Sequence, residues 1–175
     1  MRLGYWLLLL ILVLPTGPQA SVELRLYADQ SGENCTIGVN ENELVAVHVL
    51  LSTWVEQATG VRFAAPIPPA AGLTHVGDVS SYYPIGNSQM DVWVPFGTCV
   101  SGPIVIMTMY FYPSSAGEDC TYYGFQPGAL YTDCSYGEHN LGPSRGAVIN
   151  RTGIYDVTDP SPADGAQDVP LVTLL

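Results

Sequence analysis

The sequence predicts an all-β protein, an antiparallel β-sandwich, from three observations. Short stretches rich in β-branched and aromatic residues recur along the chain, and turns with Gly and Pro separate them. The 175 residues include 18 Gly, 14 Pro and 11 Tyr, and tyrosine favours strands. Hydrophobic residues make up 47% of the chain and charged residues only 12%, which is not the composition of a disordered protein.

Two segments are the strongest strand candidates. Residues 43–51 are apolar on both faces, as a central strand covered on both sides is. Residues 103–112 are ten residues rich in β-branched and aromatic side chains. A helix over 43–57 is the alternative for the first segment, but its density of Val favours a strand.

The remaining strands are shorter and are bounded by turn residues. Residues 22–27 alternate apolar and polar side chains, and a polar turn with Gly follows at 28–34. Prolines exclude a central strand over 66–72, because proline has no N–H to donate to a neighbouring strand. We expect a hairpin of 121–125 with 129–134. Further strands are expected at 60–65, 73–79, 89–94 and 146–150.

The first 20 residues have the layout of a secretory signal peptide. Arg2 supplies a positive charge, and residues 5–14 form an apolar run that is short beside the roughly 20 residues of a membrane-spanning helix. Cleavage is expected after Ala20, with an uncleaved anchor as the alternative. The sequence therefore predicts a secreted or extracytoplasmic chain without stable membrane insertion once the signal is removed.

The charge of the chain argues against anionic partners. Five Arg and no Lys stand against 16 Asp and Glu, a formal net charge of −11. Such a chain repels phosphate, so we expect no nucleic-acid partner and no attraction to an anionic membrane surface.

Four cysteines, Cys35, Cys99, Cys120 and Cys134, all follow the signal segment. An exported chain with an even number of cysteines usually pairs them, and three pairings are possible. We expect two disulfides, Cys35–Cys99 and Cys120–Cys134, because the second closes a short loop between neighbouring predicted strands. Zinc binding is the weaker alternative, since no two cysteines have the C-x₂-C spacing.

The character of the chain changes near residue 151. Residues 21–150 form the predicted sandwich domain, and 151–161 have the polar, proline-bearing composition of a linker. The string PADGAQDVPLVTLL at 162–175 resembles the start of the fibronectin-III and immunoglobulin-like repeats of bacterial exported proteins. That resemblance implies that 162–175 are the truncated start of a second, Ig-like module.

The first module carries a resemblance of its own. Its strings LRLYADQSGENC, GVRFAAP and FGTCVSGPIVIMTMYFYP resemble uncharacterised exported bacterial β-sandwich modules. More loosely, residues 47–65 are similar to the cohesin and carbohydrate-binding β-sandwich superfamily, in which a hydrophobic strand precedes a G-V-x-F strand. The resemblance implies an Ig-like or cohesin-like sandwich that binds rather than catalyses. It carries over no functional residue.

Tyrosines are the candidate ligand-binding residues. In a strand, Tyr110 and Tyr112 share one face, opposite Met109 and Phe111. With Tyr122 and Tyr123 they offer flat amphipathic rings that suit a glycan or a partner protein. The alternative is that these rings only pack and cover the sheet.

Histidines and acids give weaker signals. His48 lies inside an apolar strand and is expected to be a hydrogen-bonded core residue. His139, with Asp133, Ser135 and Glu138 nearby, suggests a hydrolase triad, but the chain has no G-x-S-x-G string. The acids at 29–34 and at Asp156, Asp159, Asp164 and Asp168 could supply calcium ligands, although neither stretch has EF-hand spacing.

Together these observations predict a non-enzymatic structural or adhesive module of a secreted or cell-surface protein, with no metal and no cofactor. Its expected partners are other modules of the same or a parent protein, a glycan or a surface protein. A carbohydrate-binding module that uses exposed tyrosines is the first alternative, and a secreted hydrolase is the second.

Overall fold

A computed structural model describes residues 22–53, 56–142 and 144–151. The predicted signal peptide over 1–20 and the predicted second module over 162–175 lie outside these residues, as does the predicted linker beyond Arg151. In the described part of the chain, no helix is both long enough and apolar enough to cross a membrane.

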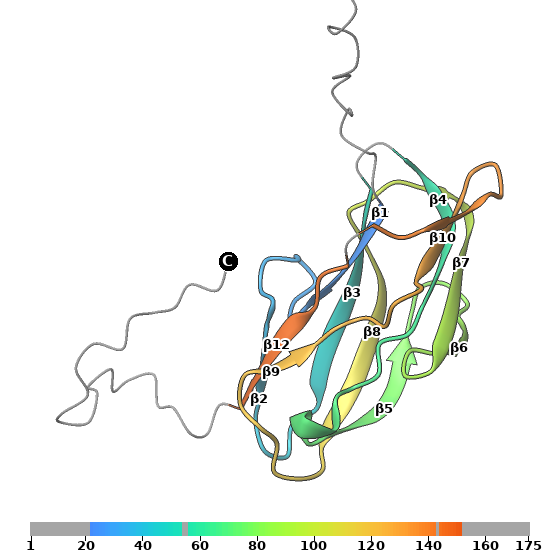
Figure 1. Cartoon of the computed structure of the whole chain (residues 1–175). Coiled ribbons are helices and arrows are strands. Elements are labelled where there is room, and N and C mark those ends of the chain that lie inside the picture. Colours follow the sequence, from blue (N-terminus) through green and yellow to red (C-terminus); the bar gives the residue numbers. More distant parts are fainter. Residues whose placement is uncertain (1–21, 54–55, 143, 152–175) are drawn as a thin grey trace, which may run out of the picture.

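The described residues fold as an all-β sandwich, which confirms the predicted fold class (Figure 1). A single short 3₁₀ turn at Pro69–Ala71 interrupts the strands within these residues, in the segment whose prolines exclude a central strand. The strands are β1 Val22–Tyr27, β2 Thr36–Val39, β3 Val45–Thr53, β4 Ala58–Phe63, β5 Leu73–Val79, β6 Ile85–Asn87, β7 Asp91–Val100, β8 Ile104–Pro113, β9 Thr121–Tyr123, β10 Leu130–Asp133, β11 Glu138–Asn140 and β12 Ala147–Arg151.

Two main sheets form the layers of the sandwich. One has the strand order β1-β3-β8-β5 and the other the order β11-β10-β4-β7-β6, and all their pairings are antiparallel. A smaller sheet, β2-β12-β9, contains the parallel pair β2–β12. The predicted central strand over 43–51 is confirmed, because β3 lies between β1 and β8. The strand predicted over 103–112 is β8, and it also lies inside the sheet, between β3 and β5.

The core fills the space between the two main sheets. Along β3 every second residue is fully buried, and Met109 and Phe111 of β8 point the same way. From the other sheet, Val61 and Phe63 of β4 pack inward, as do their cross-strand partners on β7. Each such side chain stabilises the fold by about 1.5–3 kcal/mol relative to an exposed one.

The hairpin expected between 121–125 and 129–134 is wrong. Strand β9 pairs with β12, whereas β10 pairs with β4 and β11, so the two segments belong to different sheets. Tyr123 is fully buried, and its hydroxyl donates a 2.8 Å hydrogen bond to the carbonyl of Ala65. Three residues later, the N–H of Gln126 donates to Ala64. These contacts fix the connection from the small sheet to the five-stranded sheet, where a tight turn was expected.

The expected cysteine pairing is also wrong. Cys99 is bonded to Cys134, with 5.6 Å between their Cα atoms, which lies in the usual range for a disulfide. Strands β7 and β10 flank β4, and both reach Ala58, so the register brings the two cysteines together. Cys35 and Cys120 are free and exposed, and they precede β2 and β9 on opposite sides of β12.

Candidate functional site

The candidate site is the outer face of the five-stranded sheet. The register aligns Leu130 of β10, Arg62 of β4, Trp93 of β7 and Ile85 of β6 in one row across the strands. Their neighbours along β4 and β7 are buried in the core, so this row points away from it. With Asp91, these four residues are called the Arg62 face below.

An ion pair lies at the centre of the Arg62 face. Arg62 Nε lies 2.9 Å from Asp91 Oδ1, and Arg62 Nη2 lies 2.6 Å from Asp91 Oδ2. The arginine hydrogen bonds lower the pKa of the Asp91 carboxyl and keep it ionised. The two side chains are 56% and 51% exposed, so this pair orients charge on the surface rather than stabilising the fold.

Trp93 lies against the sheet beside this ion pair. A Cβ atom placed on Gly60 would lie only 2.6 Å from Cζ2 of Trp93, so the absence of a side chain at Gly60 makes room for the indole. Trp93 is half-buried, and Ile85 beside it is 67% exposed. The result is an aromatic and aliphatic surface held in place next to a guanidinium and a carboxylate.

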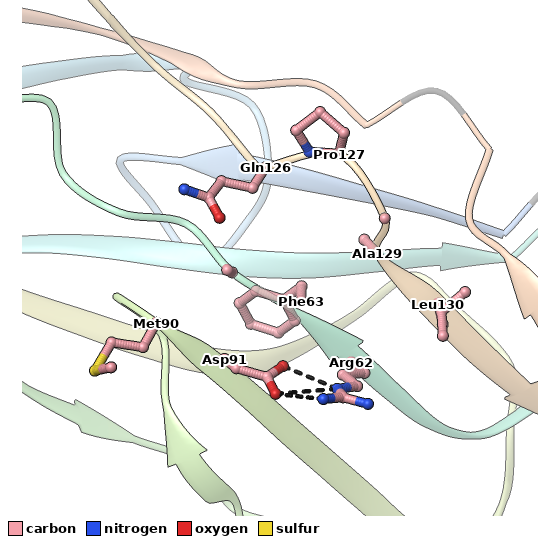
Figure 2. A pocket seen from close by; sticks show the side chains of 10 residues that line it. Arg62, Phe63, Met90, Asp91, Gln126, Pro127, Ala129 and Leu130 are labelled. Atoms are coloured by element: carbon pink, nitrogen blue, oxygen red, sulfur yellow. Dashed lines mark hydrogen bonds and ion pairs between the residues drawn. The ribbon is translucent and has the colours of Figure 1, made fainter.

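Two hollows adjoin the ion pair, one on each side. The first, of about 230 Å³, lies between the ion pair and the β9–β10 connection. Figure 2 shows Arg62 and Asp91 facing each other at one side of it, with Gln126 and Pro127 at the other. The second, of about 380 Å³, is lined by Arg62, Ile85, Gly86, Asp91, Trp93 and Glu138. Arg62 and Asp91 line both hollows, so the surface is depressed on each side of the ion pair.

The turn between β10 and β11 explains the acid and histidine cluster noted in the sequence. Asp133 accepts the backbone N–H groups of Ser135 and Gly137 at 2.7 and 2.8 Å, and its other oxygen lies 2.7 Å from His139 Nε2. The His139 hydrogen bond is the largest cause of a lowered pKa at Asp133. The imidazole also stacks on Tyr131. These contacts give His139 and Asp133 the role of closing a turn, and Ser135 contributes to it through its backbone.

The structure places the four candidate tyrosines at three different locations. Tyr110 and Tyr112 lie on the outer face of the four-stranded sheet, half-buried and 42% exposed respectively, with Met109 and Phe111 on the inner face. Tyr122 lies on the small sheet, 64% exposed. Tyr123 is fully buried, so its ring has no free face for a ligand. Its side chain points into the core because strand alternation turns it away from Tyr122.

His48 is buried and hydrogen-bonded, as expected, but it lies on the outer face of the four-stranded sheet, opposite the core residues Val47 and Val49. It is 7% exposed, and its Nδ1 lies 2.9 Å from the hydroxyl of Thr108. Burial lowers the pKa of the imidazole, which favours the neutral form.

The acidic turn after β1 is organised around Asp29. Its carboxylate accepts the Ser31 hydroxyl and the backbone N–H groups of Gly32 and Asn34, the latter two at 2.8 and 2.7 Å. In a calcium site these oxygens would point at the cation, whereas here they accept hydrogen bonds from the turn. No group of three His, Cys, Asp or Glu side chains in the described ranges could hold a metal ion. The acids expected near the module junction lie outside those ranges.

Replacing Asp29 with Asn is expected to flatten the loss of stability in acid. The hydrogen bonds from Ser31 and the backbone lower the pKa of Asp29 from 3.8 to about 2. A carboxyl with a lowered pKa stabilises the fold above its unfolded pKa, and that stabilisation is lost as the pH falls from about 4 towards 2. Melting temperatures measured across this range should fall less steeply for Asp29→Asn than for the wild type. Parallel profiles would contradict this, and Glu33→Gln in the same turn is the matched control.

Sequence reasoning assigned residues 89–94 to a strand but missed the site on it. The usable signal was the alternation in QMDVWV, which places Asp91 and Trp93 on one face and two valines on the other. In the same way, Arg62 lies between Val61 and Phe63 in the sequence, so its side chain points to the face opposite theirs. The sequence did not reveal that β4 and β7 are adjacent, which is what joins these residues into one surface.

Comparisons with known proteins identify the fold. No protein-family model matches the sequence, and no curated protein matches it. A non-cellulosomal cohesin from Archaeoglobus fulgidus superposes with a TM-score of 0.57 at 9% identity, covering 79% of this chain and 96% of that one. The chain has the cohesin fold. This confirms the cohesin-like sandwich that the sequence suggested.

Two further structures place the cohesin fold in different contexts. A cohesin module from a Clostridium perfringens family 33 glycoside hydrolase has a TM-score of 0.57 and 9% identity, covering 75% of this chain and 98% of the other. The third ScaB cohesin of R. flavefaciens, solved in complex with a group 1 dockerin, has a TM-score of 0.54 and 14% identity, covering 77% and 96%. At these identities the likeness concerns the fold.

Proposed function

We propose that this chain is a non-catalytic module of an exported multi-module protein and that its Arg62 face binds a partner protein. The observation that carries the proposal is a row of Trp93, Arg62 and Ile85 on the outer face of the sheet, with a hollow on each side of an ion pair. Trp and Arg are the residue types most enriched among those that dominate protein–protein binding energy.

The geometry of the Arg62 face fits a protein partner. The face is held by strands rather than by loops, so it costs little conformational entropy to order when a partner binds. Trp93 supplies apolar area, and the exposed Arg62–Asp91 pair and Glu138 supply polar groups around it. Protein interfaces are enriched in aromatic residues and Arg and also contain polar groups that hydrogen-bond the partner.

The positions of the first and last described residues support a module that works in series with others. Val22 pairs with Thr53, the last residue of β3. Arg151 pairs with Val39, which precedes the first residue of β3 by six positions and so lies near the opposite end of that strand. The chain therefore enters and leaves at opposite ends of the sandwich (Figure 1). This arrangement suits a chain of modules, in which the Arg62 face stays free along the side.

The structural neighbours suggest the partner class to test first. Several were solved as cohesin–dockerin complexes, so a dockerin-type module is the first candidate for the partner of this chain. Export into an oxidising compartment, which the signal-like segment predicts, is consistent with a solvent-accessible disulfide in this module.

Replacing Trp93 with Ala is expected to weaken partner binding by at least about tenfold, the usual effect of removing an interface aromatic. The measurement is surface plasmon resonance of the immobilised full chain against a panel of purified dockerin modules. Arg62→Glu should weaken the same complex, because it places two carboxylates side by side.

Tyr122→Ala is the matched control, since it removes an exposed ring from another sheet and should leave binding unchanged. The proposal fails if no dockerin in the panel binds, or if the Trp93→Ala and Tyr122→Ala variants bind as the wild type does. Thermal melting of each variant separates loss of binding from loss of fold.

A further inference from the structure

The outer face of the four-stranded sheet carries a second exposed surface, on the other side of the sandwich from the Arg62 face. The register places Tyr112 beside Thr74, Tyr110 beside Gly77, and Thr108 beside Val79. Tyr112 is 42% exposed and Val79 is 59% exposed. Tyr110, Tyr112, Thr74, Gly77 and Val79 are called the Tyr112 face.

A gap lies next to Tyr110 on this face. A Cβ atom placed on Gly77 would have no heavy atom within 4 Å outside its immediate chain neighbours. Tyr110 and Tyr112 are two residues apart on one strand, about 7 Å. The face therefore offers two aromatic rings along a line, with open space at the side of one of them.

The polar groups around the Tyr112 face are hydroxyls and an amide. The hydroxyl of Thr74 donates to that of Ser114 at 2.7 Å, and the hydroxyl of Tyr112 lies 3.4 Å from the amide oxygen of Asn42. These neutral groups can both donate and accept hydrogen bonds. They match the hydroxyl groups of an uncharged sugar.

The ionised side chains on the outer face of this sheet lie away from the two tyrosines: Glu23 and Arg25 form an ion pair on β1, which β3 separates from β8. Asp78 of β5 pairs with the inward-facing Met109, so it points away from the outer face; it accepts hydrogen bonds from the N–H and hydroxyl of Ser88 and lies 2.8 Å from His75 Nε2. Glu41 and Glu43 lie in the adjoining turn, and the whole chain carries a net charge of −11. An anionic ligand would be repelled here, whereas a neutral ligand would not be.

We propose that the Tyr112 face binds a neutral polysaccharide, with sugar rings against Tyr110 and Tyr112 and one ring edge in the space over Gly77. This site is distinct from the Arg62 face, so the module binds a protein on one side and a glycan on the other. The aromatic rings supply apolar contact at low entropic cost, and the hydroxyl and amide groups orient the sugar.

Affinity electrophoresis of the full chain tests the proposal. Native gels contain either mixed-linkage β-glucan or glucomannan, which are neutral, or polygalacturonate, which is anionic. We expect retardation by at least one neutral polymer and none by polygalacturonate. The double variant Tyr110→Ala and Tyr112→Ala should bind about tenfold more weakly. Gly77→Leu should also weaken binding, because it fills the gap without meeting another atom.

Trp93→Ala is the matched control and should be retarded as the wild type is, which separates this proposal from the one for the Arg62 face. The proposal is overturned if no neutral polymer retards the wild type, or if the tyrosine variants are retarded equally. It is also overturned if size-exclusion chromatography with light scattering shows a dimer that Tyr112→Ala dissociates. That result would assign the face to a second copy of the chain.

Discussion

Replacing Cys99 and Cys134 with Ser is expected to lower the free energy of unfolding by about 4 kcal/mol. The bond closes a loop between residues that are 35 apart in sequence, so its removal increases the conformational entropy of the unfolded chain. It also joins β7 to β10 across the start of β4, where Ala58 pairs with both strands. Urea unfolding at equilibrium measures the change.

Reduction provides an independent measurement of the same quantity. A dithiol reductant should destabilise the wild type as much as the double substitution does and should leave the double variant unchanged. Cys35→Ser with Cys120→Ser is the matched control and should keep the wild-type stability. If the control lost stability as well, Cys35 and Cys120 would also be disulfide-bonded, which would contradict the pairing seen here.

Replacing Arg151 with Ala is expected to lower the free energy of unfolding by about 3 kcal/mol. Its Nη2 atom lies 3.1 Å from the carbonyl oxygens of Ala71 and Gly72 and 2.7 Å from that of Ser115. These three carbonyls belong to turns next to β5 and β8, so one guanidinium joins the last described strand to the four-stranded sheet. The substitution leaves all three acceptors without this charged donor.

Thermal and urea unfolding of Arg151→Ala, Arg151→Lys and Arg145→Ala tests this role. Lys keeps the charge but not the planar guanidinium, so an intermediate loss is expected. Arg145 is exposed, and its substitution should change stability by less than about 0.5 kcal/mol. Equal losses in the free energy of unfolding for Arg151→Ala and Arg145→Ala would show that the contacts with the three carbonyls do not stabilise the fold.

The strands could be located from sequence because their signal is local. The apolar stretches at 43–51 and 103–112 became β3 and β8, and the alternation of 22–27 became β1. His48 was correctly expected to be buried for the same reason, but strand alternation places it on the outer face of its sheet rather than in the core. Strands of three or four residues, such as β6 and β11, contain too few residues for periodicity to reveal them.

The candidate site could be predicted only in part. Tyr110 and Tyr112 were expected on one face of a strand, and they lie there. The role of Arg62 was missed, because its partner Asp91 is 29 residues away and is brought close by the pairing of β4 with β7. Tyr123 was offered as a ligand residue, although its hydroxyl is used inside the core.

By itself, the sequence determined the all-β class, the two longest apolar strands and the acidic, lysine-free character of the chain, because composition and periodicity act over a few neighbouring residues. Only the tertiary structure decided which strands are neighbours, and with them the Cys99–Cys134 bond, the separation of β9 from β10 and the assembly of the Arg62 face. Strand pairing brings together residues distant in sequence, and the fit of side chains between the layers of the sandwich selects among pairings that local patterns leave equally possible.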